Sequence, residues 1–202
     1  MCGRYYLEES PELRPIVEAM NRSPLVREFH KSTAVRGSGE IRPADVAPAI
    51  ASNRRGQRSV FPMRWGFAGK TLLINAKTET AAEKPTFRDA WKSHRCVVPA
   101  SWYFEWEHFV TPDGKKKTGE KYMLQPKGAA VTWLCGLYRM EEGLPCYVIL
   151  TREPSDEIRF IHDRMPLMLP EGAIDAWISP QANPAEIIKA AQTEIVFERV
   201  GS

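Results

Sequence analysis

Many short strand-like runs, separated by turn residues, recur along this chain and constrain what it can fold into. We expect strands at residues 46–52, 59–67, 96–99, 103–108, 121–125, 131–139 and 146–151, with shorter ones at 167–169 and 194–198. The basic turn after residue 52 and the Pro-Asp-Gly run within 111–120 are typical of hairpin connections. A chain with this many closely spaced strands is expected to be built around β-sheets.

Helical spacing is confined to a few segments between these strands. Residues 10–22 open with Ser-Pro-Glu and carry Leu13, Ile16, Val17 and Met20 on one face. Further helices are expected at 80–93, 154–160, 172–178 and 184–192, and a Gly-, Ser- and Pro-rich loop at 31–44. Strands and helices do not alternate as in βαβ units, so we predict an α+β fold with mainly antiparallel pairing. No repeat or linker divides the chain, and we expect one domain over residues 1–202.

Composition excludes several classes of protein. The net charge of +3 permits a polyanionic partner without requiring one. No apolar run is long enough to cross a membrane, and the N-terminus lacks the pattern of a signal peptide. Cys2, Cys96, Cys135 and Cys146 form no CxxC pair and no metal-type cluster with the histidines. We therefore expect a cytoplasmic monomer with reduced thiols, no cofactor and no metal.

Cys2 is the residue with the most distinctive chemistry. Removal of Met1 would leave an N-terminal cysteine that carries both an α-amine and a thiol. Such a pair can trap an aldehyde, because the amine forms a Schiff base and the thiol then closes a five-membered thiazolidine. The second step is intramolecular and therefore fast. The ordinary pKa values, about 8 for the amine and about 8.5 for the thiol, suit neutral pH.

Three other polar clusters interrupt apolar stretches. Asn75 and Lys77 follow an apolar strand, Glu105 lies among aromatic residues, and His162 stands beside Asp163 and Arg164. Each also has an ordinary structural interpretation: Asn75 as a turn residue, Glu105 as a strand residue facing solvent, His162 as a surface histidine. A carboxyl group in an aromatic pocket can nevertheless act as an acid near neutral pH.

Taken in order, these clusters resemble the SRAP family (SOS response-associated peptidase), the abasic-site-processing proteins. The resemblance covers nearly the whole chain. It is carried by Met1-Cys2-Gly3-Arg4, Trp65-Gly66, Asn75-Ala76-Lys77-Thr78-Glu79-Thr80, Phe87-Arg88, Arg95-Cys96, Pro99-Ala100, Glu105-Trp106, Leu150-Thr151 and His162-Asp163-Arg164-Met165-Pro166.

The resemblance implies a barrel-like core with peripheral helices and covalent crosslinking to abasic sites in single-stranded DNA. It makes Cys2 the nucleophile, and Asn75 the group that holds the N-terminus or the opened sugar. Glu105 would shuttle protons during Schiff-base formation and ring closure, and His162 would assist sugar opening and crosslink release. The family is also proposed to cleave peptides, including its own Met1, through the same cysteine.

DNA binding is expected to use cations and stacking surfaces. DNA contacts are expected at Arg4, Lys77 and Arg164, which lie next to catalytic positions, and at Arg64 and Thr151. The resemblance adds Pro48 and Trp65, although Trp65 has the alternative of a core tryptophan. The chain departs from the family pattern at Asp45, Gly69, Lys77 and Trp102, which affects the shape and charge of the DNA path.

Two further functions remain open at this stage. Cys2 with His162 as base would make a cysteine peptidase. A non-catalytic single-strand-binding module would instead depend on Arg4 and Lys77 and be indifferent to substitutions at Asn75, Glu105 and His162. On DNA the cytoplasmic protein would be nucleoid-associated.

Overall fold

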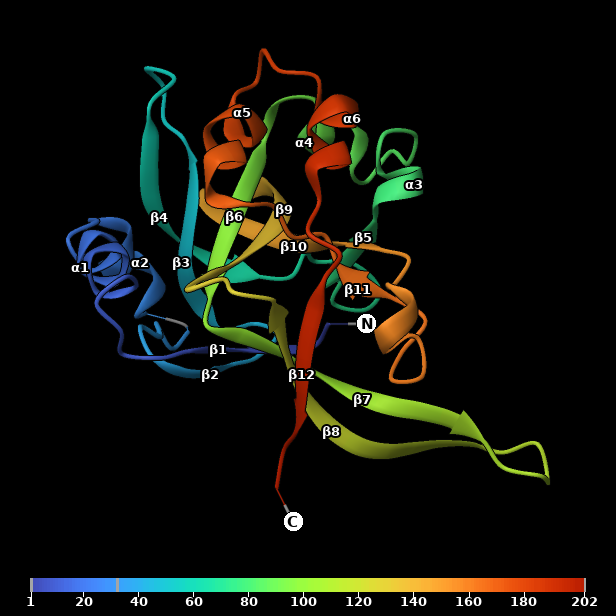
Figure 1. Ribbon diagram of the computed structural model, residues 1–202. Helices are drawn as coiled ribbons and strands as arrows, with labels where there is room; N and C mark the ends of the chain where they lie inside the picture. Colours follow the sequence, from blue (N-terminus) through green and yellow to red (C-terminus); the bar gives the residue numbers. More distant parts are fainter. Residues whose placement is uncertain (1, 32, 202) are drawn as a thin grey trace.

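Two β-sheets form the centre of the computed structural model, which describes residues 2–31 and 33–201 (Figure 1). One sheet closes into a barrel, because β10 pairs with both β4 and β9 and completes the ring β10–β4–β3–β6–β9. The barrel strands are β3 (Val46–Ser52), β4 (Arg58–Trp65), β6 (Arg95–Ala100), β9 (Thr132–Glu141) and β10 (Leu144–Arg152). The predicted α+β fold with mainly antiparallel sheets and a barrel-like core is confirmed.

Close approach of strands inside the barrel depends on one glycine. Gly136 of β9 lies between β6 and β10, and a Cβ atom there would sit 2.7 Å from the Val148 carbonyl oxygen and 3.0 Å from the Cys96 sulfur. Only glycine leaves room for this contact. The apolar runs of β3 and β6 are buried over nearly their whole length, as expected for strands covered on both faces.

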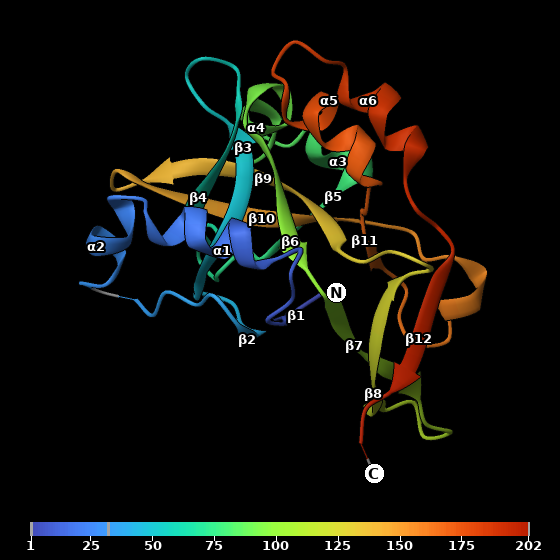
Figure 2. The same ribbon diagram turned by 60° about the vertical axis from the view of Figure 1, so that its left-hand side comes forward.

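The second sheet has the order β12–β8–β7–β1–β2, and its β7–β8 hairpin projects from the barrel as an arm (Figures 1 and 2). Its strands are β1 (Arg4–Leu7), β2 (Gly39–Ile41), β7 (Trp102–Val110), β8 (Lys116–Pro126) and β12 (Ile195–Arg199). The hydroxyls of Tyr5 in β1 and Tyr147 in β10 are hydrogen-bonded at 2.8 Å in the interior. This bond links the two sheets at the point where the chain begins.

Two very short strands complete the pairing of β10. β5 (Asn75–Lys77) runs parallel to it, and β11 (Met165–Pro166) pairs with its end in antiparallel fashion. β4 is also parallel to β10. The pairings of β5 and β11 matter because they bring the polar segments that follow residues 74 and 161 to the same strand.

Short helices cover the sheets. α1 (Arg14–Asn21) packs against β3 and β4, and α2 (Leu25–Phe29) against β4, while the remaining helices gather at the other end of the barrel (Figure 2). They are α3 (Thr78–Ala81), α4 (Arg88–Ser93), α5 (Ile174–Ile178) and α6 (Pro184–Ile187), with 3₁₀ turns η2 (Glu171–Ala173) and η3 (Ile188–Ala190). The 3₁₀ turn η1 (Asp156–Ile158) lies apart from them and contacts β12. Among the described helices, none is both long and apolar enough to cross a bilayer.

One buried cation holds α4 and α5 against the barrel. The Arg95 guanidinium is 1% exposed and donates to the carbonyl oxygens of Trp91, Lys92, Trp177, Ser179 and Ala182. The first four carbonyls lie at the C-terminal ends of the two helices, where the helix dipole favours a positive charge, and that of Ala182 lies in the turn after α5. Arg95 thus satisfies two helix ends at once.

The structure corrects several predicted elements. The helix expected at 80–93 is two helices, α3 and α4, because Pro85 lacks the N–H that a continuous helix needs. The helix expected from residue 10 begins at Arg14, after a turn whose Leu13 N–H donates to the Ser10 side chain. The loop expected at 31–44 contains β2, and α2 was not predicted. Residues 167–169 form no strand, since Met168 makes only an isolated bridge to Leu134.

Candidate functional site

Cys2 lies where β1 enters the second sheet. The pairing of Arg4 with Phe104 places the start of β1 beside Glu105 on β7. The Cys2 side chain is 0% exposed, and its sulfur donates to the Arg4 carbonyl oxygen at 3.8 Å. Capture of an aldehyde by Cys2 calls for an exposed amine and sulfur that face a cleft, and this structure does not expose the sulfur. The sulfur packs into the apolar core instead of facing an open cleft.

Burial also sets the protonation state of this thiol. Loss of solvent, followed by the nearby charge of Glu105, raises the pKa of Cys2 well above its ordinary value. The sulfur is thus a neutral thiol at pH 7. A reaction at this sulfur requires a base that takes the proton as the bond forms.

Asn75 holds the Cys2 backbone. Its side-chain Nδ2 donates to the Cys2 carbonyl oxygen at 3.0 Å. Its Oδ1 is buried and has no hydrogen-bond partner among the described residues. The parallel pairing of β5 with β10 places Asn75 opposite Ile149, so the barrel fixes the amide beside the N-terminus. Asn75 is therefore a strand residue and not the turn residue of the alternative interpretation.

Glu105 faces inward from β7. Its side chain is buried, with only 3% of its surface exposed, and Oε1 accepts a hydrogen bond from the Trp106 N–H at 3.2 Å. The alternative of a solvent-facing strand residue is excluded. Tyr103, two positions earlier on the same strand, shares this face, and its hydroxyl is buried without a described partner. The charges of Cys2 and Glu105 both act on Tyr103, after burial as the main cause, to raise its pKa.

His162 reaches the site from the turn after η1. Its Nδ1 accepts a hydrogen bond from the Arg164 N–H at 3.0 Å and lies 2.7 Å from Asp163 Oδ1. The first contact suits a neutral ring and the second a ring protonated at Nδ1, so the two arrangements compete. Burial lowers the pKa of His162 below its ordinary value, whereas the charges of Glu105 and Asp163 raise it. The neutral ring, which can accept a proton, is favoured at pH 7.

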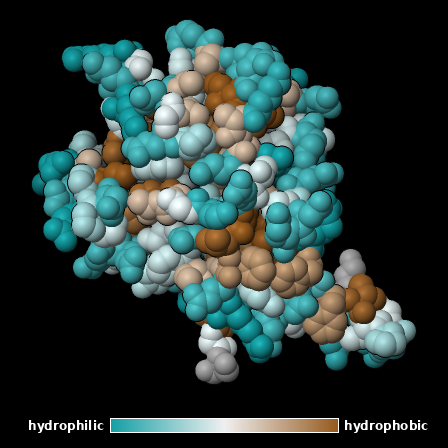
Figure 3. All heavy atoms as spheres, viewed as in Figure 1, coloured by the Kyte–Doolittle hydropathy of each residue, from teal (hydrophilic) through white to brown (hydrophobic). Residues whose placement is uncertain are grey.

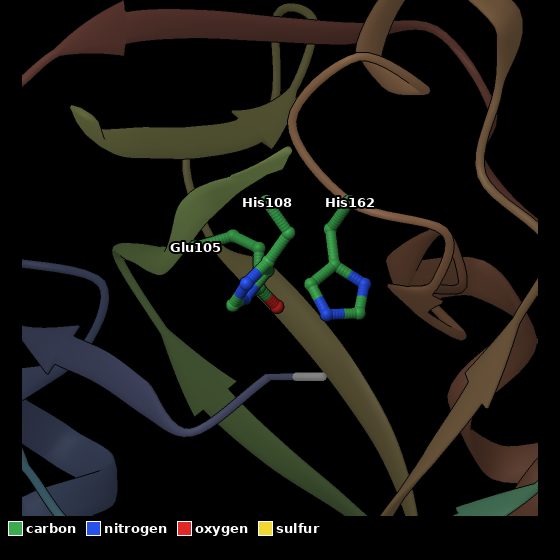
Figure 4. A group of neighbouring side chains, drawn as sticks. All are labelled: Glu105, His108 and His162. Carbon is green, nitrogen blue, oxygen red and sulfur yellow. The ribbon is translucent and has the colours of Figure 1, made fainter. Parts of the chain in front are cut away.

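His108 is the neighbour that sequence reasoning missed. Its ring contacts the His162 ring edge to face, with centroids 4.8 Å apart, and Figure 4 shows both rings beside Glu105. His108 lies three residues after Glu105, and strand alternation places such residues on opposite faces. A register shift between Trp106 and His108 interrupts that alternation, which the sequence does not signal.

The expected DNA-contacting cations differ in availability. Lys77 is exposed at the end of β5. Arg4 forms an ion pair with Glu40, at 3.3 Å. Arg164 donates to both carboxylate oxygens of Glu79, at 2.9 and 2.8 Å, and to the Thr151 carbonyl oxygen. Phosphates would have to compete with carboxylates for the last two cations.

Of four further residues expected to contact DNA, three are buried and one is paired with a carboxylate. Trp65 is 0% exposed, donates to the Ile74 carbonyl oxygen and stacks on Tyr147, so the core alternative holds. Pro48 and Thr151 are buried in the barrel strands β3 and β10. Arg64 is paired with Glu141 at 2.6 Å.

The departures from the family pattern are accommodated locally. Asp45 is paired with Arg36 at 2.8 Å, so its charge is compensated. Trp102 stacks on Tyr6, with centroids 4.9 Å apart. A side chain at Gly69 would come within 3.1 Å of the Thr71 carbonyl oxygen. Glu105, His108 and His162 form a group of possible metal ligands that includes none of the cysteines.

Comparison with known proteins extends these findings. The abasic site processing protein YoqW of Bacillus subtilis (strain 168) is 30% identical over 205 residues, which cover 94% of this chain and 85% of that protein. The abasic site processing protein YedK of Escherichia coli (strain K12) is 26% identical over 207 residues, 97% of this chain and 87% of that protein.

Solved structures share the fold. A protein from Bacteroides thetaiotaomicron superposes with a TM-score of 0.73 at 18% identity, covering 100% of this chain and 93% of that one. A phage-related protein from Bordetella bronchiseptica gives a TM-score of 0.72 at 23% identity, covering 100% and 95%. The family described as SOS response associated peptidase (SRAP) matches residues 1–201. The chain belongs to the SRAP family.

Proposed function

We propose that this protein processes abasic sites in single-stranded DNA by forming a thiazolidine crosslink through Cys2 after removal of Met1. The observation that carries the proposal is the hydrogen bond from Asn75 to the Cys2 carbonyl, in a site that also holds Glu105 and His162. The relatives named abasic site processing proteins, which match over most of this chain, support the same substrate.

The proposed reaction joins both groups of Cys2 to one carbon of the sugar. The abasic ring opens to an aldehyde, and the α-amine adds to C1′ to give a carbinolamine that loses water. The sulfur then adds to the imine carbon, its proton passes to a base, and the imine nitrogen gains a proton. One water is released overall, and the ring contains sulfur, Cβ, Cα, nitrogen and C1′.

The neighbouring groups suit these proton transfers. After burial, the charge of Glu105 raises the pKa of Cys2, and we assign to Glu105 the transfer of protons during water loss and ring closure. Neutral His162 lies within 4.8 Å of Glu105 and is assigned to opening of the sugar and to crosslink reversal. Asn75 positions the N-terminus. Removal of Met1 is required, because only then does Cys2 carry the α-amine.

DNA is proposed to approach along exposed cationic and aromatic surface near the arm. Lys77 is exposed, pairs with no carboxylate of the described residues and lies two residues from Asn75. Tyr122, Phe160 and Phe197 pack edge to face, and the last two are 48% and 42% exposed. Hydrophobic colours gather where the arm leaves the body (Figure 3). Such rings stack with bases irrespective of sequence, and we assign them the role expected earlier for Trp65.

A denaturing gel of two Cys2 variants tests the proposal. Wild-type protein lacking Met1 should form a heat-stable adduct with a single-stranded oligonucleotide that carries an abasic site. Cys2→Ala and Cys2→Ser keep the α-amine but lose the sulfur, so they should be trapped only when borohydride reduces the imine. A stable adduct of Cys2→Ala without borohydride would overturn the thiazolidine mechanism. A cysteine peptidase would instead cleave unrelated peptides in the absence of DNA.

A further inference from the structure

Three possible metal ligands from two separate segments converge beside Cys2. A carboxylate oxygen of Glu105 and ring nitrogens of His108 and His162 all lie within 4.8 Å of one another (Figure 4). Glu105 and His108 belong to β7, whereas His162 follows η1. Two imidazoles and one carboxylate, with a fourth position open, are a ligand set that zinc uses in catalytic sites.

Backbone contacts fix the histidines relative to each other. The His108 N–H donates to the Ile161 carbonyl oxygen at 3.1 Å, which ties the arm to the residue before His162. The register shift after Trp106 turns His108 toward Glu105. The backbone therefore brings both imidazoles to one carboxylate.

The outer side of His162 is also arranged as in metal sites. Figure 4 shows one ring nitrogen facing Glu105 and His108 and the other pointing away. The outward nitrogen is Nδ1, since it is the atom 2.7 Å from Asp163 Oδ1. Metal-bound histidines usually donate their second N–H to a carboxylate in this manner, which fixes the ring and strengthens the ligand.

We propose that Glu105, His108 and His162 bind a zinc ion that inhibits the reaction at Cys2. Ligand atoms about 2.1 Å from tetrahedral zinc lie about 3.4 Å apart, so side-chain movements of about 1 Å would close the site. His108 is exposed and can make such a movement. Binding through Nε2 leaves the ring proton on Nδ1, where Asp163 accepts it and the hydrogen bond from the Arg164 N–H is given up.

The inhibitory consequence rests on the proposed function. With zinc bound, the Glu105 oxygen and the His162 nitrogen that face the site are occupied and cannot transfer protons. The charge of Glu105 acts on Cys2, so the same carboxylate cannot serve both the zinc ion and the Cys2 thiol. Zinc would therefore stop the crosslinking reaction before the sulfur attacks.

Zinc binding is tested without DNA, by competition with a chromophoric chelator. The untagged protein carries Cys2→Ala, so that zinc held by an N-terminal amine and thiol alone is excluded. This protein should bind one zinc ion per chain, and His108→Asn should weaken zinc binding at least tenfold. His30→Asn is the control, because His30 is an exposed histidine at the C-cap of α2, and it should leave zinc binding unchanged. Absence of zinc binding, or equal binding by both histidine variants, would overturn the site.

Inhibition is measured separately, with each protein compared with its own zinc-free rate. Zinc should slow crosslinking by the protein with intact Cys2, and EDTA should restore it. His108→Asn should be at least tenfold less sensitive to zinc than His30→Asn. Zinc bound without slower crosslinking would refute the inhibitory role. If no crosslink forms even without zinc, the proposed function fails while the binding result stands.

Discussion

Glu105→Gln is expected to lower the pKa of His162, because it removes a charge that stabilises the imidazolium. The two groups lie within 4.8 Å of each other. At an effective dielectric constant of about 20, unit charges at that separation interact by about 3.5 kcal/mol. This energy corresponds to about 2.5 pKa units, and screening through the exposed side of the site reduces it to about one to two.

NMR titration of the His162 ring protons measures this shift, with the exposed His30 as an internal reference. Glu107→Gln is a matched control, because it removes a carboxylate from the same strand whose Oε2 faces Gly119. The control should leave the pKa of His162 within a few tenths of a unit of wild type. An unchanged or higher pKa of His162 in Glu105→Gln would show that the charge of Glu105 does not stabilise the imidazolium.

Three further predictions concern other parts of the structure. Arg95→Met should lower the free energy of unfolding, measured by urea denaturation, by about 3–5 kcal/mol, because five carbonyls lose their buried donor. The control Arg159→Met breaks an exposed ion pair with Asp156 and should change the free energy of unfolding by less than about 1 kcal/mol. Asn75→Ala should slow crosslinking about five- to tenfold through loss of the bond to Cys2, measured as single-turnover gel kinetics, and a rate equal to wild type would remove Asn75 from the mechanism. The pKa of His162 is lower in the folded than in the unfolded chain, so the contribution of His162 to stability is complete above about pH 6.5 and is lost as the pH falls below that value. Urea denaturation from pH 8 to 5 should show this loss of stability in wild type and a smaller loss in His162→Asn.

Local sequence patterns predicted the long strands well, and the helices and the short strands β1, β2, β5 and β11 poorly. The apolar run 46–52 is β3 with the same bounds, because continuous burial in a barrel needs the continuous apolar residues that the sequence displays. The helix expected at 80–93 is interrupted at Pro85, because proline has no N–H to continue the helix. The helical spacing of Phe87, Ala90 and Trp91 had favoured one continuous helix. β5 was missed because three residues paired to a distant strand carry no periodic signal.

The candidate site was predictable only where its residues have distinctive chemistry. The grouping of Cys2, Asn75, Glu105 and His162 followed from family resemblance, and the Asn75–Cys2 bond agrees with the expected contact. Burial was not predictable. The sequence of Trp65 next to a cation is compatible with either a DNA-stacking surface or a core tryptophan. Its packing on Tyr5 and Tyr147 shows that it belongs to the core. The place of His108 in the site depends on a register shift in β7, which no local sequence pattern indicates.

The intact mass of the protein after incubation with an abasic single-stranded oligonucleotide tests the central claim most directly. The account predicts one species whose mass is that of the chain without Met1 plus the oligonucleotide, less one water. A matched oligonucleotide with an intact base should give no adduct. Persistence of the unmodified mass, or the same stable adduct with Cys2→Ala, would contradict the assignment of Cys2 as the residue that captures the lesion.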